Sequence, residues 1–428
     1  RANASGVVPL SGAGSEDDPF VLSTPEALAW FAHKVNADGT QAIANSDGTD
    51  GGLVFEGTAN EKPRPYASAC AELGANIDLF GTQATGSAQD YIDASTPRTA
   101  GNALRWTPVG VGGGSYKAAA FNGGGCKIDY LNVVSPDFTI GLFGVVHGCT
   151  IEGVNVAGNS QVRSSVDGDA VAGGIAGMAA NATIDGCTYG GLVSASVAGG
   201  IVGYFSDSDR LAPGLFNSMA NCSSTATVEG MCAGGLVGGF MNEKPVGDVV
   251  LEKSFNRGSV TSSGMAGGLV GMAATGTPMK VSECYSTGSV GGGPAQVPGP
   301  DDGVPVGIGG LVGGVMSYPD GELSIERSYA APQAFSPNAN VPDDSRGALI
   351  GGYTARYERT TISLDGCRYE NGSGTLLDGA GAVGSSCLAF VAGGAVTDAM
   401  AKGVPTAGLQ DWAAAYAMNG NAYAGDAA

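Results

Sequence analysis

Histidine is almost absent from this 428-residue chain, which contains only His33 and His147. Because there is no His-x-x-x-His pair, the sequence offers no ligand set for a zinc peptidase. Neither histidine stands beside a motif typical of a serine nucleophile. We interpret His33 as a surface residue and His147 as a structural residue at a corner. The sequence therefore predicts no catalytic, cofactor-binding or metal-binding residue, and we expect that the protein is not an enzyme.

Basic residues are also scarce, with 20 lysines and arginines against 40 acidic residues and a net charge of −20. This charge repels phosphate backbones and anionic lipids, so we expect neither nucleic acid nor a membrane surface as partner. No apolar run reaches the roughly 18 to 20 residues of a transmembrane helix. The chain begins at Arg1 without a signal-peptide apolar region, as expected of an exported protein that has lost its leader. We expect an extracellular protein, on the cell surface or secreted.

The nine cysteines contain no Cys-x-x-Cys pair, which excludes a zinc ribbon. Glycine, by contrast, is abundant, with 74 residues and no collagen-like triplet. Much of it belongs to a recurring pentapeptide, Gly-Gly-aliphatic-x-Gly. Its copies begin at Gly173, Gly199, Gly234, Gly267 and Gly309, and degenerate copies begin at Gly141 and Gly347. Self-similarity at this period predicts a stack of units and not a single globular core.

Each unit contains three short pieces with strand-like alternation, of which the pentapeptide is the first. The second carries a small residue that we expect to point inward and to stack from coil to coil. This predicted ladder follows Val154 and consists of Cys187, Cys222, Ser254, Cys284, Ser328 and Cys367. Exchange between cysteine and serine indicates a need for small size, and we favour buried free thiols over disulfides or a metal site. The third piece is Gly/Ala-x-Val.

Three parallel strands per unit predict an all-β fold, a right-handed parallel β-helix. Paired glycines would let the chain turn with positive φ, or let a neighbouring wall approach closely. The repeat glycines to which we assign this structural role are Gly174, Gly200, Gly235, Gly268 and Gly310.

The two ends differ from the repeats. Thr24 suits a helix N-cap and Pro25 a first helical position, and Leu28, Phe31, Ala32 and Val35 form an apolar face. We therefore predict a capping helix at 25–36 within an N-terminal cap, 1–103, that also holds the first strands and long loops. The β-helix follows at 104–370. Residues 371–428 are predicted to form a small C-terminal cap or a truncated next module, with short helices at 397–401 and 409–418.

These motifs together resemble the GLUG-motif family of bacterial surface proteins, which occurs in adhesin-like proteins and in non-catalytic parts of some IgA peptidases. The resemblance covers roughly residues 14 to 370, with apparent insertions at 40–68 and 80–103. Besides the Gly-Gly-Leu-Val-Gly copies, it rests on Asp18-Pro19-Phe20, Leu22-Ser23-Thr24, Glu26-Ala27-Leu28-Ala29-Trp30, Asn76-Ile77-Asp78-Leu79, Trp106-Thr107-Pro108-Val109-Gly110, Phe121-Asn122-Gly123 and Gly141-Leu142-Phe143-Gly144. It implies an exported β-helical module and no particular reaction.

Extra residues between the strands fall in two classes of corner. One class follows the first strand, at 205–216 and 241–247, and the other follows the third strand, at 291–306 and 331–346. Insertions on a solenoid often form its binding surface, so we expect an adhesin-like stalk or binding module. Its partner would be a host glycan or an extracellular protein, and the sequence leaves the oligomeric state open.

Parallel β-helices also carry carbohydrate-active enzymes, which need clustered carboxylates. The candidate acidic positions are Asp17-Asp18, Asp207, Asp209, Asp301-Asp302 and Asp343-Asp344. All lie in loop-like segments, so we interpret them as solvated carboxylates. Weak calcium binding by such loops and a β-helical polysaccharide lyase or glycosidase stay as alternatives.

Overall fold

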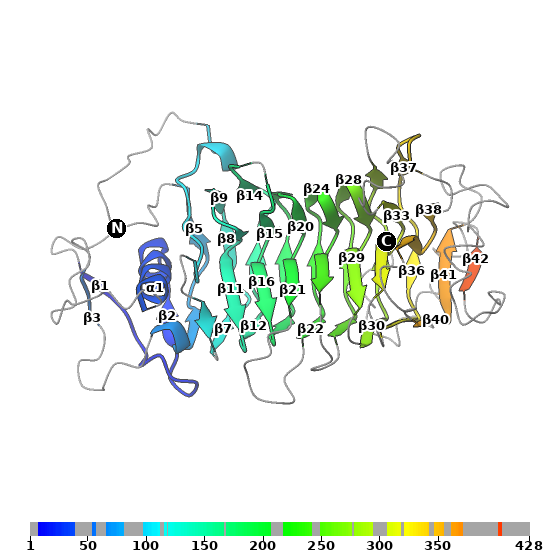
Figure 1. Cartoon of the computed structure of the whole chain (residues 1–428). Coiled ribbons are helices and arrows are strands. Elements are labelled where there is room, and N and C mark those ends of the chain that lie inside the picture. The colour runs from blue at the N-terminus through cyan, green and yellow to red at the C-terminus, as the bar shows by residue number, and fades with distance from the viewer. Residues whose placement is uncertain are drawn as a thin grey trace.

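The described part of the chain is an elongated rod of stacked β-coils, with the helix α1 (Pro25–Asp38) near its N-terminal end (Figure 1). The structure, a computed structural model, describes residues 7–38, 54–56, 66–80, 97–111, 115–117, 119–166, 168–206, 217–241, 249–275, 278–293, 306–317, 321–341, 346–354, 361–370 and 401–404. Strands of successive coils pair in parallel along the whole rod. The predicted all-β fold, a parallel β-helix, is confirmed.

Two sheets form the front and the lower side in the orientation of Figure 1. The front sheet consists of β6 (Tyr116–Lys117), β11 (Phe143–His147), β16 (Ala176–Ala180), β21 (Val202–Ser206), β25 (Val237–Met241), β29 (Val270–Thr275), β34 (Val312–Ser317) and β39 (Ile350–Thr354). The lower sheet consists of β2 (Phe20–Leu22), β4 (Ala71–Leu73), β7 (Ala120–Asn122), β12 (Thr150–Glu152), β17 (Thr183–Asp185), β22 (Asn217–Ala220), β26 (Val249–Glu252), β30 (Pro278–Ser282), β35 (Glu322–Glu326) and β40 (Thr361–Asp365).

Two further sheets close the coil. The back sheet consists of β5 (Ile77–Asp78), β8 (Lys127–Asp129), β13 (Asn155–Val156), β18 (Thr188–Tyr189), β23 (Ser223–Ser224), β27 (Phe255–Asn256), β31 (Tyr285–Ser286), β36 (Tyr329–Ala330), β41 (Cys367–Glu370) and β42 (Ala401–Val404). The upper sheet has two arms. The first arm holds β9 (Asn132–Ser135), β14 (Gln161–Ser164), β19 (Leu192–Ser194), β32 (Val290–Gly292) and β37 (Phe335–Pro337). The second arm holds β10 (Thr139–Ile140), β15 (Val171–Gly173), β20 (Val197–Gly199), β33 (Gly307–Gly309) and β38 (Arg346–Gly347).

The long strands β24 (Thr227–Gly234) and β28 (Ser259–Gly267) run through both arms of the upper sheet. The remaining elements lie outside the coils: a small parallel pair, β1 (Val7–Pro9) with β3 (Val54–Glu56), and two single-turn 3-10 helices, η1 (Tyr66–Ser68) and η2 (Ala100–Asn102). A complete coil thus contains more strand segments than the three that the sequence predicted.

The pentapeptide is a corner and not a strand, which corrects the sequence interpretation. Its first glycine ends a strand of the upper sheet and its fourth residue begins one of the front sheet, as at Gly234 and Val237. Successive corners stack through amide-to-carbonyl bonds, for example from the Leu236 amide to the Leu269 carbonyl at 2.9 Å. The aliphatic residue is fully buried in the core. The motif therefore specifies a tight bend between two walls.

Close approach, and not positive φ, explains the repeat glycines. None of Gly174, Gly200, Gly235, Gly268 and Gly310 is among the positive-φ residues of the described chain. A Cβ on Gly235 would lie 2.1 Å from the Gly268 carbonyl oxygen and 2.4 Å from the Asn256 side chain. The corresponding Cβ on Gly268 would lie 2.1 Å from the Gly310 oxygen. The second glycine thus lets a back-sheet side chain of the same coil reach the corner.

Positive φ occurs at a different corner, between the lower and back sheets. The residue before each ladder position is left-handed there: Gly153, Gly186, Asn221, Lys253, Glu283, Arg327 and Gly366. Four of these seven residues carry side chains, although L-residues with a Cβ disfavour this region. The strain is therefore tolerated at a corner whose geometry is fixed by the neighbouring coils.

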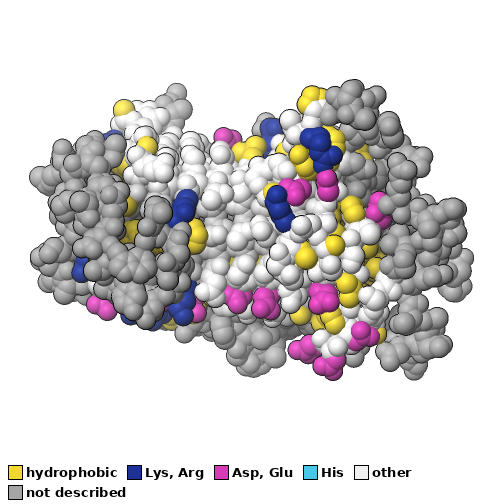
Figure 2. All heavy atoms as spheres, turned by 180° about the vertical axis from the view of Figure 1, so that it is seen from behind, with side chains coloured by type: hydrophobic (Ala, Val, Ile, Leu, Met, Phe, Trp, Pro, Cys, Tyr) yellow, Lys and Arg dark blue, Asp and Glu magenta, His cyan; other side chains and the backbone are white. Residues whose placement is uncertain are grey.

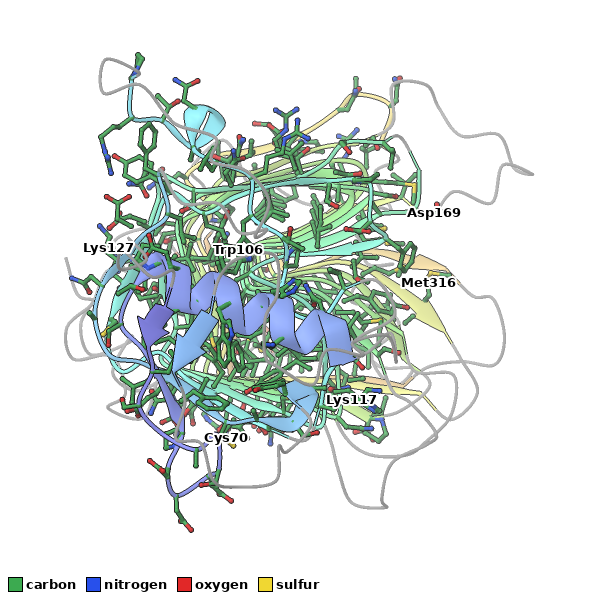
Figure 3. All side chains as sticks on the ribbon, turned by 90° about the vertical axis from the view of Figure 1, so that its left-hand side faces the viewer. Cys70, Trp106, Lys117, Lys127, Asp169 and Met316 are labelled. Atoms are coloured by element: carbon green, nitrogen blue, oxygen red, sulfur yellow. The ribbon has the colours of Figure 1, made fainter. Side chains whose placement is uncertain are left out.

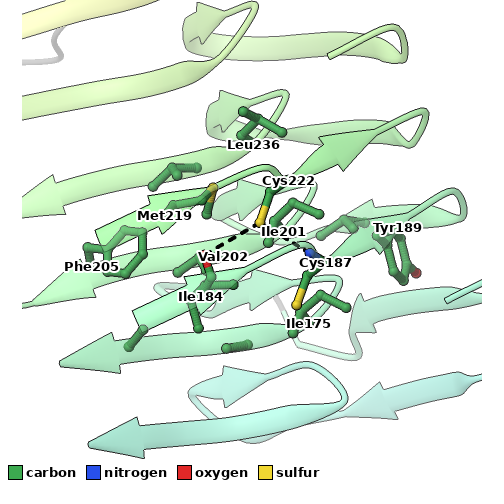
Figure 4. Packing of buried hydrophobic residues seen from close by; sticks show 14 of the residues in the cluster. Ile175, Ile184, Cys187, Tyr189, Ile201, Val202, Phe205, Met219, Cys222 and Leu236 are labelled. Carbon is green, nitrogen blue, oxygen red and sulfur yellow. Dashed lines mark hydrogen bonds between the residues drawn. The ribbon is translucent and has the colours of Figure 1, made fainter. Parts of the chain in front are cut away.

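The structure places all six predicted ladder residues in the core, each with 0% exposure. They are linked by hydrogen bonds as well as by size. The Cys187 amide donates to Cys222 Sγ at 3.4 Å, and the Cys222 amide donates to Ser254 Oγ at 3.0 Å. The hydroxyl of Ser254 donates in turn to the Glu252 carbonyl at 2.7 Å. Figure 4 shows the two cysteines stacked beside the corner residues Ile175, Ile201 and Leu236. Each ladder position therefore accepts a small side chain that can donate one hydrogen bond and accept another.

The eight cysteines within the described ranges are free thiols, and Cys387 lies outside these ranges. Cys222 and Cys232 are both free, so no bridge joins them. Burial raises the pKa of the Cys284 thiol to about 12 and that of Cys367 to about 11. These thiols are therefore neutral and inert at ordinary pH.

The N-terminal helix α1 (Pro25–Asp38) closes the rod and runs two residues beyond the predicted end. The Thr24 hydroxyl accepts a hydrogen bond from the Ala27 amide at 3.1 Å, as expected of an N-cap. The buried Phe31 ring contacts Tyr116 and Phe121 in the opening coils. In Figure 3 the helix lies across the end of the coils. It covers core that an open end would expose to water.

The predicted C-terminal cap lies outside the described residues except for β42, which pairs with β41 from Cys367↔Ala401 onward. Ala401 is therefore in a strand, and the expected helix at 397–401 does not include it. The predicted helix at 409–418 and most of both predicted N-terminal insertions, 40–68 and 80–103, also lie outside the described residues. Among the described residues, no helix is long and apolar enough to cross a membrane.

Candidate binding surface

The two classes of long corner interrupt the coil at different steps, one between the front and lower sheets and the other between the two arms of the upper sheet. Residues 207–216 and 242–248 follow β21 and β25 and connect them to the lower sheet. Residues 294–305 and 342–345 connect the two arms of the upper sheet, between β32 and β33 and between β37 and β38. Part of each predicted insertion of the second class is strand, including β37, which pairs with β32. The true interruptions are therefore shorter than the sequence indicated.

The edge between the two arms of the upper sheet also carries apolar side chains in solvent. Phe138 is 59% exposed, Val166 48% and Met231 41%, and these are the exposed large hydrophobic residues of the described chain. Phe138 and Val166 lie in adjacent coils, because the Val171 amide bonds to the Phe138 carbonyl, and the Met231 amide bonds to the Ser196 carbonyl of the intervening third coil. Phe138 belongs to the first of four consecutive coils, Val166 to the second and Met231 to the fourth. We call these three residues the rim.

Where the upper sheet meets the front sheet, outward-facing side chains of the two walls pack together, and we call this cluster the crease. Cys232 and Met265 from the upper sheet and Met272 from the front sheet form its buried centre, and Val197, Tyr204 and Met316 pack around them. This cluster is separate from the core inside the coil. The crease is thus an outer apolar cluster bordered by the rim.

Glycines of the pentapeptide form the floor of the crease. A Cβ on Gly234 would lie 1.9 Å from the Val237 carbonyl oxygen, and one on Gly238 would lie 2.6 Å from the Gly203 oxygen. On the front wall, a Cβ on Gly314 would lie 2.7 Å from the Met265 Cε atom. The glycines at the first and fifth positions of the pentapeptide therefore allow the two walls to approach each other here.

The rim is acidic as well as apolar. Asp137 precedes Phe138, Asp169 lies in the corner that carries Val166, and Glu229 lies two residues before Met231; all three are exposed. Figure 3 shows Asp169 and Met316 on the same side of the rod. Arg163 is the nearest basic residue in these strands and is also exposed. Burial raises the pKa of the Cys232 thiol to about 11, so the crease itself carries no charge at neutral pH.

A second acidic row lies on the lower edge, and two of its members, Asp185 and Glu326, are held by partners. Glu152, Asp185, Glu252 and Glu326 occupy one register column of the lower sheet, and acidic side chains follow that edge in Figure 2. Lys280 contacts Glu326 at 2.9 Å, and its hydrogen bond lowers the pKa of that carboxyl. Asn221 donates to Asp185 at 2.8 Å. These contacts, together with the Arg327–Glu283 ion pair, stabilise the corner between the lower and back sheets.

The structure does not gather the acidic positions that the sequence singled out. Asp17 and Asp18 are exposed in a bend near the N-terminal cap, and Asp207, Asp209, Asp301-Asp302 and Asp343-Asp344 lie outside the described residues. His33 is exposed on α1, as predicted, and His147 ends β11, where burial lowers its pKa. In the described part of the chain, no group of three or more histidine, cysteine or acidic side chains is arranged to hold a metal ion.

Sequence reasoning missed both the rim and the crease. The rim residues occupy equivalent corners in different coils, which only the pairing of β9 with β14 and of β20 with β24 makes evident. Aligning the short segments before each pentapeptide would have placed Phe138 and Met231 in one column, with Ala170 and Ser196 between them; Val166 lies in the same corner but outside this column. The crease was not predicted because the pentapeptide was interpreted as a strand. On that interpretation the sequence does not indicate whether residues such as Met265 face the core or the outside.

Comparison with known proteins gives a likeness of fold. The rod is similar to the crystal structure of a "putative immunoglobulin A1 protease" from Bacteroides ovatus, with a TM-score of 0.53 and 17% sequence identity over 96% of this chain and 90% of that one. No protein-family model matches the sequence, and no curated protein does.

Proposed function

We propose that the chain is an extracellular, adhesin-like binding module of a bacterial surface protein and not an enzyme, and that the rim and crease form its binding surface. The observation that carries the proposal is the row of three exposed apolar side chains on one edge of a rigid scaffold. Soluble proteins seldom place large apolar side chains together in solvent unless they bind something there. The rim lies at the step between the two arms of the upper sheet, and the sequence lengthens this same step between β32 and β33 and between β37 and β38, which agrees with binding by loops on a rigid rod.

The recurring glycine corners support assignment to the GLUG-motif surface proteins, in which the repeat accompanies non-catalytic functions. The Bacteroides ovatus neighbour shares the architecture at low identity, so it supports the fold alone. Its described protease activity belongs to that protein. For this chain, peptidase activity and a β-helical polysaccharide lyase or glycosidase are the competing functions.

The test compares the full chain with a Phe138→Ser, Met231→Ser variant on an array of glycans and a panel of extracellular matrix proteins. We expect at least one ligand to be retained by the wild type and lost by the variant. Both proteins are also incubated with immunoglobulin A1 and with pectin-type polysaccharides. Turnover of either substrate by the wild type, with unchanged turnover by the rim variant, would replace this proposal with an enzymatic one.

A further inference from the structure

We infer that the partner of the rim and crease is a protein segment that is basic and apolar, and not a glycan or a second copy of this chain. The inference rests on the proposed function and specifies the class of ligand for the same surface. Three features carry it: the chemistry of the exposed side chains, the charge around them and the spacing along the rod.

The side chains favour a protein over a sugar. Phe138 could stack on a sugar ring, but Val166 and Met231 offer only aliphatic and thioether surface. Sugars present hydroxyl groups at their edges, which lose hydrogen bonds to water against such surface. In the crease, Met265 and Met272 are buried, and only the half-buried Met316 adds thioether surface to that of Met231. Flexible methionine side chains adapt to apolar side chains of a partner, as in other methionine-rich binding surfaces.

The charge favours a basic partner. Asp137, Asp169 and Glu229 surround the rim, against Arg163 alone among the strands that carry it. The whole chain carries −20, so a second copy would be repelled before its rim made contact. A segment with lysine or arginine beside its apolar residues would be attracted instead, and would pair with the rim carboxylates on arrival.

The spacing fits an extended segment along the rod. Phe138 and Met231 are separated by three coil spacings, or about 14 Å at the distance between paired strands. This distance corresponds to about four or five residues of extended chain. Alternate side chains of such a segment could contact the rim while the intervening basic ones reach the carboxylates.

The experiment measures binding of labelled peptides to the full 428-residue chain by fluorescence anisotropy at physiological salt. The probes are three hexapeptides: alternating lysine with leucine or phenylalanine, alternating lysine with serine, and alternating glutamate with leucine or phenylalanine. We expect the first to bind, and the other two to bind at least tenfold more weakly. The Phe138→Ser, Met231→Ser variant should weaken the first peptide at least tenfold, because it removes apolar contact without changing charge.

Two further variants separate a site from general attraction. Asp137→Asn with Asp169→Asn should weaken the basic apolar peptide severalfold, whereas Asp17→Asn with Asp18→Asn removes the same charge elsewhere and should leave it within twofold. Equal binding of the lysine–serine peptide, or no measurable binding of any peptide, overturns the inference. If the rim variant loses an array glycan while peptide binding is unaffected by it, the proposed function stands and the protein partner is wrong. If the rim variant binds the peptide and every array glycan as well as the wild type does, both the proposed function and the inferred protein partner are wrong.

Discussion

Two columns of side chains run along the rod, one inside the coil and one on its upper edge, and they differ in what the stacking demands of them. The inner ladder repeats cysteine or serine with full burial and a hydrogen bond to the next coil at several levels. The rim presents phenylalanine, valine and methionine to solvent, and its third coil has Ala195 and Ser196 in the same corner. The type of residue is nearly constant along the inner ladder, whereas along the rim it changes from one coil to the next.

This difference shows where stability and recognition reside in a solenoid. A coil contacts only its neighbours, so any position that faces the next coil must suit that neighbour, and its choice of residue is narrow. A position that faces water is not constrained in this way. Large apolar residues at such positions are therefore better explained by a partner than by folding. The predictions below test this separation, beginning with the position that has the least freedom.

Replacing Gly235 by Ala should give the largest loss. The added Cβ would meet the Gly268 carbonyl oxygen at 2.1 Å, and backbone on both sides has little room to move. We expect a loss of about 3 kcal/mol in the free energy of unfolding, measured by urea denaturation followed by circular dichroism. Gly101→Ala is the matched control, because its Cβ would have nothing within 4 Å. Equal midpoints for the two variants would show that the corner is not sterically closed.

The second prediction concerns alkaline pH and Cys284. Burial raises the pKa of its thiol to about 12 from an ordinary value near 9. A raised thiol pKa means that the folded state holds the proton more tightly, so this contribution is complete below pH 9 and declines as pH rises toward 12. At pH 11 the thiol should cost the folded state about 2 to 3 kcal/mol relative to pH 8.

Cys284→Ser is the variant that isolates this effect. Serine occupies the same slot at positions 254 and 328, where its hydroxyl is fully hydrogen-bonded. We expect near-wild-type stability at pH 8 and a shallower decline of the unfolding free energy between pH 9 and 11. Identical pH profiles for both proteins would mean that the thiol is not held neutral by burial.

The inner column was readable from sequence, and the outer surface was not, for a physical reason. Small residues recur at the ladder because every coil imposes the same volume, and the amphipathic pattern around Phe31 marks the cap in the same way. The pentapeptide was found but assigned to a strand, since alternation alone does not distinguish a strand from a stacked corner. Which way Met265 or Met231 faces depends on that corner. Predicting the crease therefore requires the angle between the upper and front sheets. The sequence of a single coil does not determine this angle.

A smaller effect, of opposite sign, is expected at Lys253. Its φ of 47° lies in the left-handed region, which costs a residue with a Cβ roughly 1–2 kcal/mol. Lys253→Gly should relieve this strain and stabilise the rod by about 0.5 to 1 kcal/mol after the entropy lost on fixing glycine. Thr227→Gly, at an exposed strand position, should destabilise by a similar amount. Both changes are measured by urea denaturation, and destabilisation by Lys253→Gly would contradict the assignment of strain.

The smallest effect on folding should come from the rim itself. Phe138→Ser and Met231→Ser remove side chains that are 59% and 41% exposed, so little buried contact is lost. We expect each to change the unfolding free energy by less than about 0.5 kcal/mol. Ile140→Ala, two residues from Phe138 but fully buried, should lose about 2 to 4 kcal/mol. This contrast within one segment decides whether the rim is needed for folding. If Phe138→Ser were as costly as Ile140→Ala, its exposed ring would be part of the fold, and the argument that only a partner explains it would be lost.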